Sequence, residues 1–158
     1  FEPIDLLNDT LREYFGLEHP KIGVAALNPH AGEGGQFGDE ERRIISPAIL
    51  LAQEQGIDCL GPLPADTLFL RAVQGEFDAV AAMYHDQGMI PVKLLDFESA
   101  VNITIGIPII RTSPAHGTGF DIVGRNLANP TGMKAAIITA IEMATTKKAC
   151  QLADAANK

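Results

Sequence analysis

Polar side chains follow two apolar runs of the sequence directly. His30 lies in the stretch NPHAGEGG (28–35), which comes after the apolar run 21–27. His85 lies in the stretch MYHDQG, at the end of a second apolar run. A neutral imidazole is a common metal ligand, and glycines let a ligand approach the backbone closely. His85 is therefore a candidate metal ligand. His30 can point into the same kind of cleft, although a flexible turn with a surface histidine is the alternative.

Two histidines do not complete a metal site. A catalytic zinc ion has three protein ligands and one open position. His19 precedes a proline in a turn-like segment, and His116 has a different explanation given below. We therefore expect the third ligand to lie outside this chain. Asp86, beside His85, is either an acid–base group or a residue that stabilises the positive end of a helix dipole.

Three further polar residues interrupt apolar segments. Lys93, Asn102 and Arg111 lie in or beside such segments, close after His85 in the sequence. Arginine binds phosphate or carboxylate through its planar fork, and lysine acts as a point charge. The set indicates an anion site. For any one of these residues taken alone, an exposed position on the surface is the simpler interpretation.

Two other segments are candidates for binding. Asp66 lies in GPLPADT, where it either caps a helix or takes part in a site. The loop HGTGFDIVG (116–124), followed by ANP (128–130), contains glycines that permit close contact with a flat or phosphorylated ligand. It lacks the GxGxxG pattern of a Rossmann fold. An ordered surface loop before the last helix is the alternative interpretation.

Short apolar strands alternate with helices along the chain, and this pattern predicts an α/β fold with a largely parallel sheet between helices. In such sheets the functional residues lie on loops at strand ends. Asp39 is expected to cap the second helix. The last helix is expected to present one apolar face, made of Met133, Ala136, Ile137, Ala140, Ile141 and Ala144. The predicted helices are 4–16, 40–55, 65–73, 86–95 and 131–147, and the predicted strands are 21–27, 57–61, 78–84, 100–106 and 107–111.

Composition excludes several classes of protein. The 158 residues suffice for one domain with a core, and we expect a single α/β unit over 1–158. The net charge of −8 argues against general nucleic-acid binding. Two distant cysteines make a disulfide framework and a thiolate zinc site improbable. No run approaches a membrane span, and no signal peptide is visible, so we expect a cytoplasmic protein. The chain opens at Phe1 without a methionine, which suggests a missing upstream part.

Taken together, the motifs resemble the 4-hydroxythreonine-4-phosphate dehydrogenase family of pyridoxal phosphate biosynthesis. The resemblance rests on NPHAGEGG, GPLPADT, MYHDQG, AVNITIGIPIIRTS and HGT, and it runs from about Lys21 to the last helix. It implies the fold of the isocitrate and isopropylmalate dehydrogenases. It also implies that the chain is the C-terminal portion of a longer two-domain dehydrogenase.

The resemblance assigns roles to individual residues. His30 and His85 are implied to be metal ligands, with a third histidine from an upstream segment and a site shared between two subunits. The loop at 116–129 is similar to the one that holds the adenosine part of a nicotinamide cofactor. Ala115 departs from the acidic residue common before His116. The implied substrate-binding residues are Lys93, Asn102 and Arg111, the implied catalytic residues Asp66, Asp86 and Lys93, and the implied cofactor-binding residues His116, Gly117, Thr118, Asp121 and Asn129.

The reaction implied is oxidation and decarboxylation of 4-phosphohydroxy-L-threonine to 3-amino-2-oxopropyl phosphate. The implied cofactors are NAD or NADP and a divalent metal, which is zinc, magnesium or cobalt. The implied partners are a phosphorylated small molecule and a second subunit, with no nucleic acid and no membrane. A sister dehydrogenase acting on a threonate or erythronate phosphate is the alternative. The isolated chain is expected to be an inactive phosphate-binding or dimerisation module.

Overall fold

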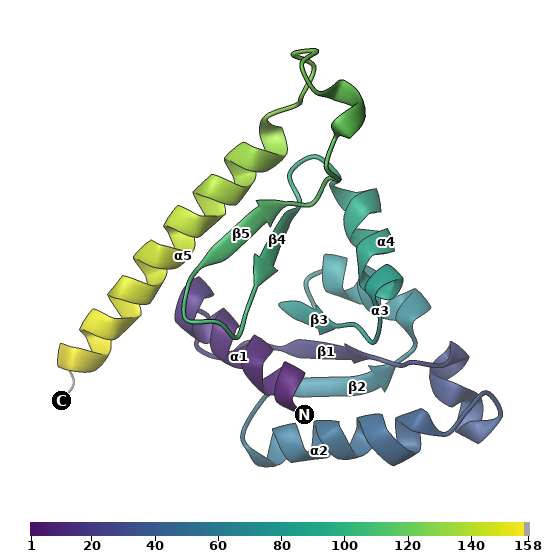
Figure 1. The fold of residues 1–158 in the computed structure, drawn as a ribbon. Helices are drawn as coiled ribbons and strands as arrows, with labels where there is room; N and C mark the ends of the chain where they lie inside the picture. The colour runs from purple at the N-terminus through teal and green to yellow at the C-terminus, as the bar shows by residue number, and fades with distance from the viewer. Residues whose placement is uncertain (157–158) are drawn as a thin grey trace. The chain divides into compact units, whose positions relative to one another are not determined.

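The computed structural model describes residues 1–156, which form two compact units (Figure 1). The first unit contains residues 1–12 and 17–91, and the second contains residues 13–16 and the described residues from 92 onward. Two helices contribute to both units: α1 (Glu2–Phe15) and α4 (His85–Leu95). Of the helices described, none combines the length and apolar character needed to cross a bilayer.

A three-stranded parallel sheet organises the first unit. Its strands are β1 (Ile22–Ala25), β2 (Cys59–Leu63) and β3 (Ala79–Ala81), in the order β2-β1-β3. All four residues of the central strand β1 are buried. A strand covered on both faces reads as a continuous apolar run rather than an alternating one, which is why the segment 21–27 predicted it. The flanking strands are shorter than, or shifted from, their predicted ranges.

The two faces of β1 pack against different helices because successive side chains point in opposite directions. Ile22 and Val24 belong to a buried cluster with residues of α1, of α2 (Ser46–Glu54) and of the π-helical turn η2 (Glu41–Ile45). On the opposite face Ala25 packs with Leu68 of α3 (Ala65–Val73) and with Phe77. Helices therefore cover both faces of the sheet, as the alternation of strands and helices predicted.

The second unit contains a β-hairpin and the long helix α5 (Thr131–Ala156). Strands β4 (Val101–Thr104) and β5 (Arg111–Pro114) pair antiparallel. The hydroxyl of Thr112 donates a hydrogen bond to the carbonyl oxygen of Ala136 at 2.8 Å and so joins β5 to α5. Figure 1 shows α5 running alongside this hairpin. A single turn of 3-10 helix, η3 (Phe120–Ile122), interrupts the long loop that precedes α5.

One predicted strand and one predicted helix cap were wrong. Residues 107–110 form the turn of the hairpin instead of a strand. Gly106 there has φ +81°, which reverses the chain, and Pro108 has no N–H group for a ladder hydrogen bond. Asp39 does not cap the helix that follows: its carboxylate accepts a hydrogen bond from Nε of Arg43 at 3.3 Å.

The last helix also departs from prediction. It extends to Ala156 rather than ending near 147. Its buried positions are Gly132, Ala136 and Met143, so the prediction is confirmed for Ala136. Met133 and Ile141, also expected on the buried face, are at least half exposed. Small residues face the hairpin because a glycine or alanine lets a helix approach a strand closely. A Cβ at Gly132 would lie 3.0 Å from Pro114.

Candidate functional site

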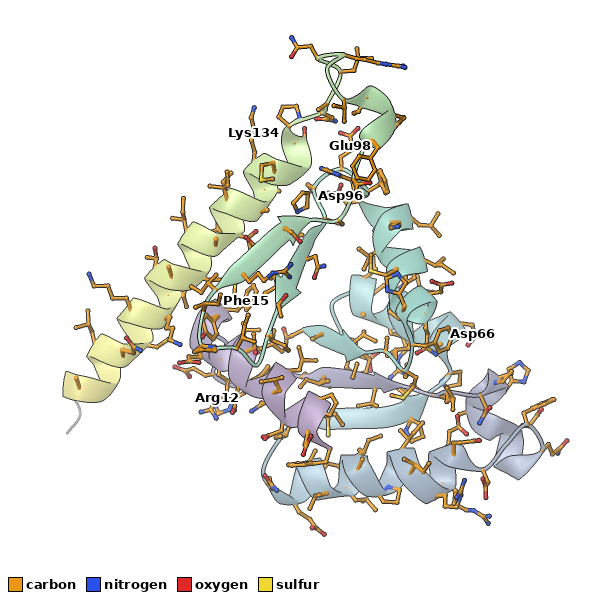
Figure 2. All side chains as sticks on the ribbon, viewed as in Figure 1. Arg12, Phe15, Asp66, Asp96, Glu98 and Lys134 are labelled. Atoms are coloured by element: carbon orange, nitrogen blue, oxygen red, sulfur yellow. The ribbon has the colours of Figure 1, made fainter. Side chains whose placement is uncertain are left out.

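Three predicted site residues follow the carboxyl ends of the three parallel strands. His30 comes after β1, Asp66 after β2 and His85 after β3. Because the strands are parallel and adjacent, these ends lie along one edge of the sheet. All three side chains are exposed, and Asp66 is labelled at the start of α3 in Figure 2. Functional candidates were expected on loops at strand ends, and His30 and His85 lie there. Asp66 does not cap α3 as the sequence suggested: the cap position is Pro64, and no side chain caps the helix. The chemical roles of all three residues stay predictions.

The loop that carries His30 has an unusual backbone. Residues 30–34 all have positive φ values, from 43° at Glu33 to 79° at Gly32. His30 itself has φ 52°, and its Nδ1 lies 3.7 Å from a carboxylate oxygen of Glu33. Left-handed conformations cost energy for residues other than glycine, and they concentrate at functional sites. The sequence indicated a Gly-rich turn here but gave no sign that histidine would share this conformation.

Glu41 supports this loop from behind, and the sequence interpretation missed it. Its buried carboxylate accepts hydrogen bonds from the backbone N–H groups of Leu27 and Asn28, at 2.9 and 2.7 Å, and from Nδ2 of Asn28 at 3.0 Å. Burial by itself raises the pKa of the Glu41 carboxyl. The hydrogen bonds from Asn28 and Leu27 outweigh burial and hold the pKa below its ordinary value.

This lowered pKa predicts a specific loss of stability in acid. A carboxyl whose folded-state pKa is depressed stabilises the protein fully above its unfolded-state pKa, and this contribution disappears as the pH falls through the folded-state value. We expect Glu41→Gln to lower the free energy of unfolding by about 1.5–3 kcal/mol at neutral pH. The difference from wild type should shrink as the pH is lowered. Urea unfolding over a pH series measures this difference, with Glu54→Gln, at an exposed carboxylate of α2, as control. A difference that does not change with pH would contradict the prediction.

Gln87 is a second buried polar residue that the sequence interpretation missed, although it lies in MYHDQG. Its Oε1 accepts from the backbone N–H of Met83 at 2.7 Å, and its Nε2 donates to the carbonyl oxygen of Ala26 at 2.8 Å. The amide therefore connects the segment after β3 to the segment after β1. Its neighbours His85 and Asp86 are exposed in the first turn of α4. An acidic residue there favours the helix dipole.

The predicted anion-binding residues lie in the second unit. Asn102 pairs with Ser113, and Thr104 with Arg111, so all four share one face of the hairpin. The opposite face carries Thr112, which bonds to α5 as described above. Arg111 is exposed, and its guanidinium donates to the hydroxyl of Thr104 at 2.7 Å. The hairpin thus presents an amide and a guanidinium on the same side.

Lys93 belongs to the second unit by way of α4. Its ammonium lies 5.9 Å from the centre of the Phe97 ring, within the range of a cation–π interaction. Apart from this contact the side chain is exposed. A lysine held only by an aromatic face keeps its donors available for an anionic ligand.

A cleft of about 1140 Å³ opens along the loop before α5. Its lining includes all five residues predicted to bind the cofactor: His116, Gly117, Thr118, Asp121 and Asn129. The structure therefore brings the whole predicted set to one cavity of the second unit. Its remaining lining comes from neighbouring loop residues, from the start of α5, and from Phe97 and Glu98.

Two side chains of this cleft have defined hydrogen bonds. Nδ1 of His116 donates to the carbonyl oxygen of Gly117 at 2.8 Å. A carbonyl cannot donate, so Nδ1 carries the proton and Nε2 of the neutral ring is left as an acceptor. The side-chain oxygen of Asn129 accepts from the backbone N–H and the hydroxyl of Thr131, at 3.0 and 2.7 Å. Asn129 thereby fixes the start of α5 and leaves its amide N–H groups for a ligand.

The donor set for a metal is incomplete within this chain. Among residues 1–156, no group of three histidine, cysteine, aspartate or glutamate side chains lies close enough to hold an ion. His30 and His85 supply two imidazoles at one edge of the sheet, and imidazole suits zinc, cobalt or nickel better than magnesium. The two residues fit part of a transition-metal site that needs at least one more ligand.

Comparison with known proteins gives a consistent result. The family described as pyridoxal phosphate biosynthetic protein PdxA matches residues 1–140. A 4-hydroxythreonine-4-phosphate dehydrogenase of Geobacter metallireducens is 58% identical over 92% of the chain. A protein of Oceanobacillus iheyensis, provisionally named D-threonate 4-phosphate dehydrogenase, is 55% identical over 91%. The chain spans about 43% of the length of each of these two relatives.

A solved structure agrees in fold. The crystal structure of a 4-hydroxythreonine-4-phosphate dehydrogenase from Klebsiella pneumoniae superimposes with a TM-score of 0.79 and 46% identity. The match covers 89% of this chain and 43% of that one. The α/β fold with a parallel sheet between helices is thus shared with a solved dehydrogenase. From the family match over 140 residues and the identity of its relatives, we conclude that the chain belongs to the PdxA family of pyridoxal phosphate biosynthetic proteins.

Proposed function

We propose that the full-length protein containing this chain oxidises and decarboxylates 4-phosphohydroxy-L-threonine to 3-amino-2-oxopropyl phosphate, with NAD and a divalent metal. The observation that carries the proposal is the placement of His30, Asp66 and His85 at the carboxyl edge of one parallel sheet, in a chain 58% identical to a 4-hydroxythreonine-4-phosphate dehydrogenase. Because the chain spans less than half of its relatives, we propose that a segment outside it completes the site, in a homodimer.

Different residues of this chain have different roles in the proposed reaction. His30 and His85 hold the metal, which supplies Lewis acidity at the reacting oxygen when bound. Arg111 and Asn102 bind anionic and hydroxyl groups of the substrate from one face of the hairpin. Lys93 binds an anionic group or carries a proton at its ammonium. Asp86 and Asp66 accept or donate protons at their carboxyl groups.

The cleft before α5 binds the nicotinamide cofactor, which supplies the oxidant for the substrate alcohol. Glu98 and Asp121 line this cleft, and no lysine or arginine of residues 1–156 is part of the lining. In Figure 2 Glu98 lies on the same side of α5 as η3, while Lys134 points away. Carboxylates favour a free ribose 2′-hydroxyl, whereas a 2′-phosphate needs a cation. This composition supports NAD over NADP.

One specific observation supports a second candidate substrate. The relative from Oceanobacillus iheyensis is nearly as similar to this chain as the relative from Geobacter metallireducens, and its name refers to D-threonate 4-phosphate. Both substrates contain a phosphate and a hydroxyl beside an acid group. The residues of this chain do not distinguish them, because Arg111 and Lys93 suit either phosphate or carboxylate.

The test is NAD and NADP reduction by the full-length protein with each substrate, with and without added Zn²⁺. We expect turnover with 4-phosphohydroxy-L-threonine that requires the metal, and at least tenfold higher kcat/KM with NAD than with NADP. Glu98→Gln should lower the ratio of kcat/KM with NAD to kcat/KM with NADP. Turnover only with D-threonate 4-phosphate would establish the second candidate. Metal-independent turnover would refute the role of the histidines.

A further inference from the structure

We propose that Gln87 and Glu41 are positioning residues that hold the two histidine-bearing strand ends in the arrangement a metal requires. The proposal rests on the proposed function, because it takes His30 and His85 as ligands. Neither Gln87 nor Glu41 touches an imidazole. Both act on the backbone from which the imidazoles project, and both are buried, at 9% and 6% exposure.

Gln87 fixes the two strand ends relative to each other. Its amide uses one donor and one acceptor, and the two partners lie on different segments. Ala26 is four residues before His30, and Met83 is two residues before His85. Strands β1 and β3 pair only from Ile22 to Val24. Beyond that pairing, the Gln87 amide is the one hydrogen-bonded connection between the two segments within residues 1–156.

Glu41 fixes the next two residues of the same strand end. One carboxylate oxygen accepts from both Leu27 and Asn28, and the other faces the Asn28 amide. A Cβ added at Gly32 would lie only 2.8 Å from that second oxygen. The carboxylate therefore shapes the left-handed turn from outside and anchors its start. Gln87 thus holds the backbone of Ala26, and Glu41 holds the backbone of Leu27 and Asn28. The side chain of Asn28 also donates to Glu40 at 2.6 Å.

This arrangement does more than satisfy buried polar groups. His30 has a disfavoured backbone conformation, which persists only where the surroundings impose it. Two exposed imidazoles on separate loops lose affinity for a metal if either loop relaxes. Loss of a group that orients a metal ligand typically lowers metal affinity by about ten- to hundredfold. Gln87 and Glu41 should therefore control metal affinity through the position of the loops.

Gln53 is a matched control. Its Nε2 donates to the carbonyl oxygen of Cys59 at 2.8 Å, the same kind of bond in the same unit. Cys59 is the first residue of β2, so this bond lies at the amino edge of the sheet, away from the histidines. Gln53→Met and Gln87→Met should both lower stability, but only the second should affect a metal site at the carboxyl edge.

The experiment titrates the full-length protein with Co²⁺ alone, by its visible absorbance, without NAD or substrate. We expect Gln87→Met and Glu41→Gln to weaken Co²⁺ binding by roughly tenfold or more. Gln53→Met and Glu54→Gln, the latter at an exposed carboxylate of α2, should bind Co²⁺ like wild type. Thermal melts of each variant without metal separate affinity from stability. If Gln87→Met does not fold, Gln87→Asn keeps a neutral amide but is one methylene too short to bond both Met83 and Ala26.

Three outcomes decide the matter. Loss of Co²⁺ affinity in the Gln87 and Glu41 variants, with the controls unaffected, supports the positioning role. Wild-type affinity in folded Gln87 and Glu41 variants, or an equal loss in Gln53→Met, overturns it while the proposed function stands. A wild-type protein that reduces NAD but binds no Co²⁺ refutes the metal site itself, and the positioning role with it.

Discussion

Replacing His85 with alanine in the full-length protein should reduce metal-dependent NAD reduction by roughly a thousandfold. The estimate follows from the several kcal/mol that a bound metal contributes to charge stabilisation, at about 1.4 kcal/mol for each factor of ten. His30→Ala should have a similar effect, because removal of either imidazole from so small a set leaves the ion inadequately held. The two effects should not add in the double variant.

Initial rates with saturating substrate and a Co²⁺ titration of each variant measure the effect. His19→Ala is the matched control: His19 is an exposed histidine of the same unit, and it precedes β1, so it lies toward the amino edge of the sheet. Its variant should keep full activity and metal binding. A His85→Ala protein that binds Co²⁺ normally would show that the ligand lies elsewhere. Loss of activity in all three variants would indicate a general effect on folding.

The convergence of His30, Asp66 and His85 could be predicted because it depends only on topology. Apolar runs alternating with helical segments require a parallel sheet, and neighbouring parallel strands end on the same side. Each of the three residues follows its strand within a few positions. No accurate element boundary was needed: β3 is much shorter than predicted, yet His85 still follows its carboxyl end.

The residues behind the site could not be predicted in the same way. Glu41 belongs to the run DEERR, where a carboxylate looks like part of a solvated helix face. Its burial results from a long-range contact with Leu27 and Asn28, which no local pattern encodes. Gln87 was visible in MYHDQG, but glutamine has no titratable group and attracted no chemical role. The available signal was a glutamine in the first turn of a helix directly after a buried strand.

Local patterns failed where the chain turns or packs through small residues. The apolar run at 107–110 suggested a strand, but a proline within it and a glycine before it favoured a hairpin turn. In α5 the predicted face contained Ala136, which is buried, but also Met133 and Ile141, which are exposed, while Gly132 packs inward unpredicted. Size rather than hydropathy decided this orientation, because close approach to β5 leaves little room for a side chain.

Leu68→Ala should lower the free energy of unfolding of the first unit by about 2–5 kcal/mol, the range for removing a large side chain from a core. Leu68 is fully buried and packs with Ala25 and Phe77. A Cβ built on Gly23 would lie 2.7 Å from its Cδ1, so the leucine fills the space that this glycine leaves on β1. Alanine would leave a void between α3 and the central strand.

Leu70→Ala in the same helix is the control for this prediction. Leu70 is 59% exposed, so its loss removes little buried apolar surface and should cost much less than the loss of Leu68. Urea unfolding followed by circular dichroism compares the two variants at the same pH. The proposed metal ligands His30 and His85 do not lie on α3, and its Asp66 is not proposed as a ligand. The folded Leu68→Ala protein should therefore retain its Co²⁺ affinity while its stability falls. An equal loss of unfolding free energy in the two variants would show that the contact of Leu68 with Ala25 and Phe77 does not hold α3 against the sheet.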